Sequence, residues 1–315
     1  MSKVDHYNAI VLVDKEVGMT SHDVVAKLRR IINQKKIGHT GTLDKAASGL
    51  LVVCLGQLTK TAQFISDCDK EYIAEITLGR ISKTYDAEGV DFDTPEKNYS
   101  NITIENIKKA LLTFVGNITQ EVPAYSAVHV DGERLYKLTR KGIDVELPKR
   151  NIIIYSIELL DFSKNILKIK VASSKGTYIR SLANDIGIKL HCGAYMSNLQ
   201  RTKVGNLSVD NALSLSQIEI LIDNNNLQDS LLQFNEVINY ATCTINDNFV
   251  DSIYNGKNIE KEYINDVYSS YEAGDKVAIK DLNGKILAVC KAEVPSNLIK
   301  NSNDQKLFSY IRVLH

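Results

Sequence analysis

Gly38-His39-Thr40-Gly41-Thr42-Leu43-Asp44 is the stretch from which the rest of the sequence is best understood. Two glycines and two threonines in seven residues favour a shaped loop over a helix or a regular strand. The loop is followed by the apolar run Leu50–Leu55, which is typical of a central strand covered on both faces. A rigid scaffold around such a loop can hold one side chain in a fixed direction, and Asp44 is the candidate. Taken alone, an aspartate in this setting is more often the cap of a turn.

The composition indicates an ordinary globular protein. The chain has 315 residues, enough for one large or two ordinary domains. Its apolar runs are far too short to span a bilayer and its N-terminus has no apolar signal segment, so we expect a cytoplasmic protein. The five cysteines are widely spaced, with no Cys-x-x-Cys and no paired His/Cys spacing. This spacing predicts free thiols and no metal site.

Charge is unevenly distributed along the chain, although 38 basic and 38 acidic residues cancel in total. Residues 27–36 contain five basic residues and no acidic one. Residues 164–203 contain eight basic residues and a single acidic one, Asp185. One such cluster is usually a solvated face, but two clusters beside the motif-rich stretches favour a phosphate-binding surface.

Apolar periodicity predicts mixed strands and helices up to about residue 240. Thr20 and Asp23 match a capping box at the start of a helix, and Tyr72–Gly79 alternates like a strand with one buried face. Arg180 is expected at the start of another helix. Further strands are expected over residues 10–13, 122–132 (with an Asp-Gly turn), 152–160 and 166–171, and a further helix over residues 104–115.

Short strands replace this pattern after an expected domain joint at residues 239–244. Asn283-Gly284 reads as a hairpin turn between strands at residues 276–279 and 286–290, and a last strand is expected at 310–314. We therefore expect a larger domain at 1–240 and a small β-barrel-like module at 241–315. The sequence contains neither a phosphate-binding loop nor Gly-x-Gly-x-x-Gly, so ATP and dinucleotide chemistry are unsupported.

Short motifs follow one another between residues 15 and 202. They are Lys15-x-x-Gly18-x-Thr20-Ser21, Gly38–Asp44 with Ala47–Leu51, Asp69-Lys70-x-Tyr72, Tyr125-Ser126-Ala127 with Gly132-x-Arg134-x-Tyr136, Ser174–Leu182, and Arg201-Thr202. In this order they resemble the bacterial tRNA pseudouridine-55 synthases, the TruB family. The resemblance implies an α+β pseudouridine-synthase fold, in which helices flank a central mixed, mainly antiparallel sheet. It also implies a small C-terminal PUA-like β-barrel domain that binds RNA.

The resemblance further implies an isomerase that converts uridine 55 in the T arm of tRNA to pseudouridine. The base is flipped out of the RNA, its N1–C1′ bond breaks, and C5 joins C1′, with no cofactor and no metal. Asp44 would be the catalytic carboxylate, held ionised by Arg180. Tyr72 would stack on the flipped base and take part in proton transfer.

Further substrate contacts are implied by the same resemblance. Tyr178 and Leu199 would complete the walls of the pocket, and His39 would lie against the RNA where the base has left the stack. Lys60 and the two basic clusters would hold phosphates. The implied partner is the T arm of tRNA, with no membrane, no protein partner and a monomeric enzyme.

Two alternatives stay open, and three positions depart from the family pattern. The chain could be a tRNA-binding protein that helps tRNA fold, with catalysis secondary, or an unrelated Asp-nucleophile hydrolase; the basic clusters and the terminal module argue against the hydrolase. Glu16 and Lys45 stand where the family usually has proline, and His129 where it commonly has lysine. Proline stiffens a loop, so we expect the loop around Asp44 to be more mobile, with the reacting groups retained.

Overall fold

The larger part of the molecule is built on one mixed sheet. The computed structural model describes residues 7–130, 132–143, 145–301 and 306–314. The strands of this sheet are β1 (Ile10–Lys15), β2 (Ile37–His39), β3 (Ser48–Leu55), β4 (Lys70–Leu78), β5 (Gly116–Glu121), β8 (Lys149–Ser163), β9 (Ile166–Ser173), β10 (Ala194–Val204) and β11 (Leu207–Ser208). Their order is β1-β3-β10-β4-β9-β8-β5, with β2 beside β3 and β11 beside β10. Within the described strands of this sheet only the β3–β10 pairing is parallel, so the mixed, mainly antiparallel sheet is confirmed.

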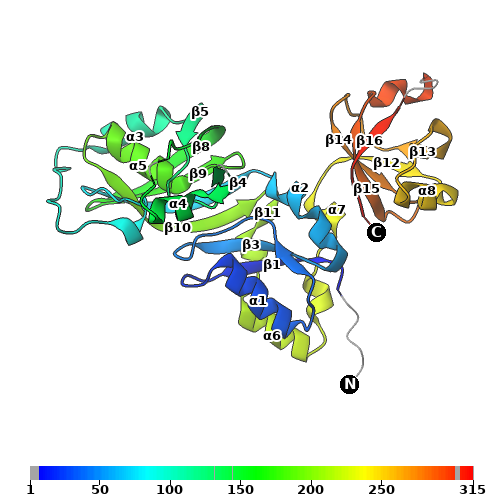
Figure 1. The fold of residues 1–315 in the computed structure, drawn as a ribbon, viewed down its shortest axis with the longest axis horizontal. Helices are drawn as coiled ribbons and strands as arrows, with labels where there is room; N and C mark the ends of the chain where they lie inside the picture. The colour runs from blue at the N-terminus through cyan, green and yellow to red at the C-terminus, as the bar shows by residue number, and fades with distance from the viewer. Residues whose placement is uncertain (1–6, 131, 144, 302–305, 315) are drawn as a thin grey trace.

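Helices pack around this sheet; Figure 1 shows one group below β1 and β3, another beside β8 and β9, and short helices on the side of the C-terminal part. Thr20 caps the first helix as predicted: Asp23 N donates to Thr20 Oγ1 at 3.1 Å and Thr20 N donates to Asp23 Oδ2 at 2.9 Å. The helices are α1 (Ser21–Ile31), α2 (Ala62–Ser66), α3 (Ile104–Leu112), α4 (Leu135–Arg140), α5 (Ile179–Lys189), α6 (Leu215–Asp223) and α7 (Phe234–Val237), with the 3-10 helices η1 (Gly56–Thr61) and η2 (Ala87–Gly89) among the short turns.

Strand β3 is buried on both faces, as its apolar run predicts. Leu51, Val53 and Leu55 belong to the main core cluster of the sheet. The alternate residues Leu50 and Val52 belong to a separate cluster that reaches the C-terminal part of the chain. Because successive side chains of a strand point to opposite faces, β3 joins these two cores.

Two predictions for this part of the chain are wrong in detail. Gly38 and His39 were expected in a loop, but they lie in β2 and pair with Cys54 and Val53 of β3. The sheet recruits them because β10 pairs with β3 only at Ser48 and Gly49, which leaves the far end of that edge open. The strand expected over residues 122–132 is reduced to β6 (His129–Val130), paired with β7 (Glu133–Arg134), since Pro123 cannot donate to a ladder. Asp131 of the expected Asp-Gly turn lies outside the described residues.

A second sheet forms the C-terminal part, with its own core. Gly284 forms the predicted hairpin turn, and its N–H donates to Asp281 O at 3.1 Å. The edge strands of the sheet are not paired with each other in the portion that the structure describes. The strands are β12 (Ala241–Ile245), β13 (Ile264–Val267), β14 (Lys276–Lys280), β15 (Ile286–Ala292) and β16 (Phe308–Val313), in the order β13-β12-β14-β15-β16, with α8 (Val250–Tyr254) beside them.

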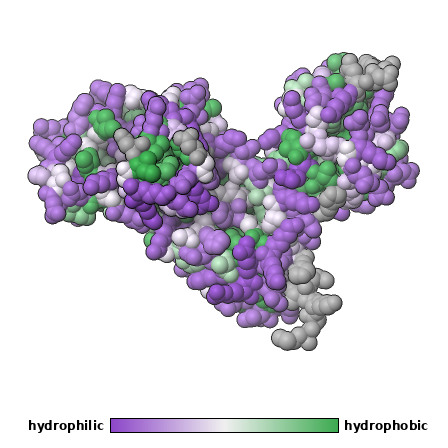
Figure 2. Space-filling view, in the orientation of Figure 1, coloured by the Kyte–Doolittle hydropathy of each residue, from purple (hydrophilic) through white to green (hydrophobic). Residues whose placement is uncertain are grey.

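The two parts meet through an apolar cluster and one carboxylate. Val289 and Leu314 of the C-terminal part join Ile10 and Phe234 in the shared cluster. Asp67 accepts Lys175 Nζ at 2.7 Å from the larger part and Lys276 Nζ at 3.2 Å from β14. Figure 2 shows a largely hydrophilic surface over both parts. No helix within the described ranges is long and apolar enough to cross a membrane.

The close approach of β10 to β3 predicts a large effect for Gly49→Ala. Gly49 has φ +95°, and a β-carbon there would lie 2.4 Å from Arg201 O. We expect the free energy of unfolding to fall by more than about 4 kcal/mol, measured by denaturant unfolding. Gly18→Ala is the matched control, because Gly18 has φ +92° with no atom within 4 Å of the added carbon. It should cost only the backbone strain, about 1–3 kcal/mol, and equal losses in the two variants would contradict the steric argument.

Candidate active site

A cavity of about 630 Å³ collects most of the residues that the sequence singles out. Its wall includes Asp44, Tyr72, Tyr178, Arg180 and Leu199, which come from the loop after β2, from β4, from the start of α5 and from β10. These segments are far apart in the chain. The sheet order brings them together because β10 lies between β3 and β4, with α5 packed against it.

Arg180 lies between two carboxylates at the base of this cavity. Its Nε is 3.7 Å from Asp44 Oδ2, its Nη1 is 3.5 Å from Asp86 Oδ2, and its Nη2 donates to Tyr125 O at 3.0 Å. The arginine side chain is 9% exposed, whereas that of Asp44 is 44% exposed. The cation is thus fixed inside the protein, and the carboxylate it attracts is open to an incoming ligand. The role of Asp86 was missed, because its only sequence signal was a place in an acidic, polar loop.

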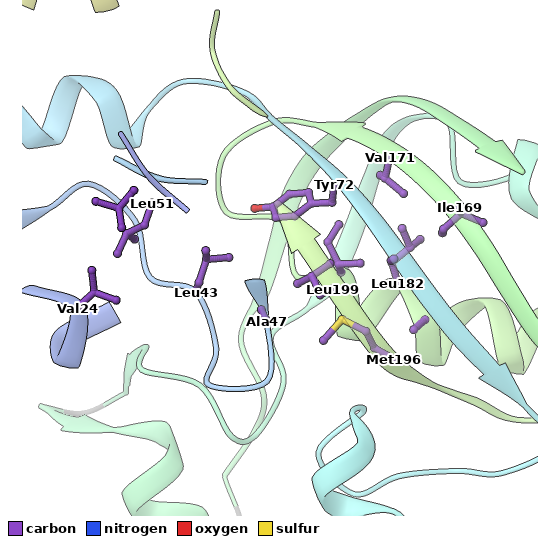
Figure 3. Packing of buried hydrophobic residues seen from close by; sticks show 14 of the residues in the cluster. Val24, Leu43, Ala47, Leu51, Tyr72, Ile169, Val171, Leu182, Met196 and Leu199 are labelled. Carbon is purple, nitrogen blue, oxygen red and sulfur yellow. The ribbon is translucent and has the colours of Figure 1, made fainter. Parts of the chain in front are cut away.

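The backbone around Asp44 is held by buried polar groups. Arg201 is 3% exposed and donates to Gly41 O at 3.1 Å and to Leu50 O at 2.8 Å. Ser21, the first residue of α1, accepts from Leu43 N at 2.8 Å and donates to Leu43 O at 3.1 Å. The loop is therefore fastened to β10 and to α1. Figure 3 shows its apolar side chain Leu43 near the core residues of β3 and α1, and Ala47 on the side of Leu199.

Asp44 itself begins a tight turn, and the two roles considered for it, turn residue and catalytic carboxylate, are compatible. Its carbonyl oxygen accepts from Ala47 N at 3.0 Å, so the backbone does close a turn. Its carboxylate takes no part in that bond and faces Arg180. Lys45, which replaces the family's proline, occupies the second position of the turn, where proline is favoured. Lys45 O also accepts from Gly18 N at 2.8 Å.

Lys15 and Arg201, near Asp44, are buried, although charged side chains are usually exposed. Burial lowers the pKa of Lys15, and the charge of Asp44 partly offsets that effect. The ammonium of Lys15 donates to Glu16 O at 2.9 Å and to Met19 O at 2.6 Å, which folds the turn ahead of α1. Burial also lowers the pKa of Arg201, and electrostatic attraction to Tyr72 acts in the opposite direction. The motif that begins at Lys15 therefore fixes the backbone turn against which the Asp44 loop packs.

Tyr72, Tyr178 and Leu199 form apolar walls. Tyr72 and Leu199 lie on the neighbouring strands β4 and β10, and Figure 3 shows them side by side. Tyr178 precedes α5, and its ring centroid is 5.9 Å from the guanidinium carbon of Arg180. The buried Gln120 fixes its backbone, accepting from Tyr178 N at 2.8 Å and donating to Tyr178 O at 3.0 Å. No pattern in the sequence indicates this role of Gln120.

Two predicted contact residues, His39 and Lys60, do not line the cavity. His39 ends β2, and burial followed by the charges of Arg201 and His22 lowers its pKa. Lys60 lies in η1, whose Thr59 side chain approaches the backbone of Gly38. His129, the third departure from the family pattern, does line the cavity. No group of His, Cys, Asp or Glu placed to hold a metal ion occurs in the described part of the chain.

A first prediction concerns the stiffness of the loop. We expect Lys45→Pro to raise the free energy of unfolding by about 0.4–1 kcal/mol, because proline restricts the unfolded chain at a position that suits it. Among the described residues, Lys45 N–H has no hydrogen-bond acceptor that proline would remove. Lys45→Ala is the control, since it removes the charge without fixing φ. A proline variant less stable than the alanine variant would refute the turn assignment.

A second prediction concerns pH. Burial, and then the charge of Arg201, lowers the pKa of Lys70 to about 8, against 10.5 for a free lysine. Between these values the unfolded chain binds the extra proton, so Lys70 contributes a rise in stability with increasing pH. Unfolding of the wild type and of Lys70→Met should therefore be compared from about pH 7 to pH 10. The wild type should gain stability relative to the variant above about pH 8, and parallel curves would contradict the burial effect.

Comparison with known proteins identifies the family of the chain. Three family descriptions match successive parts of the chain: TruB family pseudouridylate synthase (N terminal domain) at residues 29–179, tRNA pseudouridylate synthase B C-terminal domain at 180–238, and PUA domain at 241–314. Among solved structures, a chain of a Cbf5-Nop10-Gar1 complex superposes with a TM-score of 0.78 at 25% identity. That match covers 98% of this chain and 85% of the other.

Curated relatives match over most of their length. The tRNA pseudouridine synthase B of Clostridium kluyveri is 40% identical over 256 residues, which cover 81% of this chain and 86% of the relative. That of Clostridioides difficile is 37% identical over 302 residues, covering 95% of this chain and 99% of the relative. The chain therefore belongs to the TruB family of pseudouridylate synthases.

Proposed function

We propose that this isomerase, which forms pseudouridine in tRNA, acts on uridine 55 in the T arm. Family membership and relatives named tRNA pseudouridine synthase B support the reaction and the class of substrate. The observation that carries the proposed chemistry is the cavity in which Asp44, Tyr72 and Arg180 meet. Its volume of about 630 Å³ is within the usual range for small-ligand sites, large enough for a flipped nucleotide.

Each residue of the cavity has a role that fits its surroundings. The reaction breaks the N1–C1′ bond, forms the C5–C1′ bond, removes a proton from C5 and returns one to N1. Asp44 is the catalytic carboxylate, because it is the exposed anion of a cavity whose fixed cation, Arg180, lies beside it. Tyr72 stacks on the uracil and its hydroxyl takes part in proton transfer, while Tyr178 and Leu199 close the pocket around the base.

We propose a separate function for each of the two parts of the chain that have their own cores. Residues 1–240 are the catalytic domain and residues 241–315 the RNA-binding domain, which is supported by the separate C-terminal core and the PUA match. RNA is the partner, and we propose that one copy of the chain acts on the T arm in the cytoplasm without a protein partner. His39 and Lys60 would contact RNA outside the uridine pocket. Help with tRNA folding, with catalysis secondary, is the second candidate.

The test is Asp44→Asn on an unmodified tRNA transcript. We expect the rate of pseudouridine formation to fall about a thousandfold or more, because the amide keeps the shape and loses the charge. Carbodiimide labelling read by primer extension locates the product. Asp229→Asn, which changes an exposed aspartate remote from the cavity, is the matched control and should keep full activity.

Four outcomes separate the candidates. Product at position 55 with the wild type and none with Asp44→Asn supports the proposal. Near-normal product from Asp44→Asn would refute the role of this carboxylate, and product elsewhere would refute the T-arm site. Accelerated tRNA folding by Asp44→Asn as well as by the wild type would favour the folding activity as an independent function.

A further inference from the structure

The two basic clusters of the sequence differ in how many of their cations form ion pairs. Lysines of the cluster at 164–203 mostly face acids: the pairs are Lys168–Glu75, Lys170–Glu71, Lys175–Asp67 and Lys203–Glu71, at 2.7–3.9 Å. In the cluster at 27–36, Arg29, Lys35 and Lys36 form no ion pair with any described carboxylate. All three are exposed. Of the two clusters, the one at the end of α1 is therefore the one whose positive charge no described carboxylate neutralises.

These three cations line a cavity that lies next to a second one. The first cavity, of about 740 Å³, lies between the end of α1 and the start of η1. The second, of about 590 Å³, lies between η1, α7 and the β14–β15 hairpin of the C-terminal domain, where Lys285 adds a fourth cation. Asn8 and Gln57 line both cavities, so the two are adjacent, and we call them together the trough. No Asp or Glu is among the lining residues of either.

Hydrogen bonds between the residues that line the trough fix its shape. Gln57 N donates to Asn8 Oδ1 at 2.7 Å, and Lys36 Nζ donates to Gln57 Oε1 at 2.7 Å. Gly56 N donates to Lys36 O at 2.8 Å, which ties the end of the α1 loop to η1. Exposed amides beside cations can bind the hydroxyl and phosphate oxygens of a sugar–phosphate backbone. The chemistry of the trough thus suits a polyanion more than an apolar ligand.

A short path connects the trough to the uridine cavity. Lys36 lines the trough and Thr40 lines the cavity, and β2 runs between them. Four residues of extended chain span about 13 Å, which equals about four to five base pairs along a nucleic-acid helix. His39 lies on this path, and Lys60 lies in the adjoining η1. The path therefore accounts for two predicted RNA contacts that lie outside the cavity.

We propose that the trough binds the sugar–phosphate backbone of the same RNA whose uridine occupies the cavity, at least about four base pairs from that uridine. The inference rests on the proposed function, because it takes the RNA substrate from there. It assigns one continuous RNA contact to both domains: α1 and η1 from the catalytic domain, and the β14–β15 hairpin from the other. The cations contribute affinity and register, and the uridine cavity performs the chemistry.

The experiment compares two double variants of the full chain. Lys35→Gln/Lys36→Gln removes two trough cations, and Lys108→Gln/Lys109→Gln removes two exposed lysines from α3, which Figure 1 shows far from α1. The dissociation constant of unmodified tRNA transcript is measured by filter binding over a range of salt concentrations. The trough variant should bind roughly tenfold more weakly at about 0.15 M salt, with a log–log salt slope reduced by about 1.5. The α3 variant should match the wild type.

Two further measurements make the test specific. A hairpin whose stem has fewer than about four base pairs ends before the trough, so the trough variant and the wild type should bind it equally. The single-turnover rate at saturating tRNA should be unchanged, because the trough holds no reacting group. Equal affinity and slope for the two double variants, an equal loss on the short hairpin, or a lower saturated rate would each overturn the proposal. A wild type that binds tRNA through the trough without making pseudouridine would instead refute the proposed function alone.

Discussion

The buried guanidinium of Arg201 is the interaction on which the rest of the site depends. It donates to Leu50 O in β3 and to Gly41 O and Thr42 O in the loop that leads to Asp44, from its own place in β10. No carboxylate pairs with it in the described chain, so carbonyl oxygens must satisfy the charge. A buried cation without these acceptors would be costly, which leaves the loop little freedom to move away. The position of Asp44 is thus set by the solvation of an arginine that lies behind it.

Supports of this kind explain why the motifs are spread along the chain. The residues around Lys15 and Ser21 act on backbone carbonyls and amides, and they shape the loop without reacting with substrate. Arg180 combines both tasks, since it is anchored by Tyr125 O and also faces Asp44. A substitution in such a support changes the geometry of the site even where the reacting groups are retained. Lys45 shows the converse, because the turn closes without the proline that usually stands there.

Local patterns predicted most of the fold and part of the site. The β3 run, the Thr20–Asp23 cap and the Asn283-Gly284 hairpin each depend on residues close in sequence. The contacts of Arg180 with Asp86 and of Gln120 with Tyr178 join residues more than fifty positions apart, and no local periodicity encodes them. Asp44, Tyr72 and Arg180 were found by resemblance to a family; composition and spacing alone favoured a turn cap. The pairing of β2 was missed because it depends on the part of the β3 edge that β10 leaves unpaired.

Ionic strength also acts on the two ion pairs of Asp67 with Lys175 and Lys276, which we call the Asp67 bridge. Its two lysines come from the segment just before Tyr178 and from the first residue of β14, and all three side chains are partly exposed. Exposed ion pairs weaken as salt screens them, so added salt loosens the seating of the C-terminal domain as well as the contacts with phosphate. A salt titration of this enzyme therefore reports a sum of intramolecular and intermolecular screening. Only the difference between two proteins that share the Asp67 bridge isolates the RNA contribution.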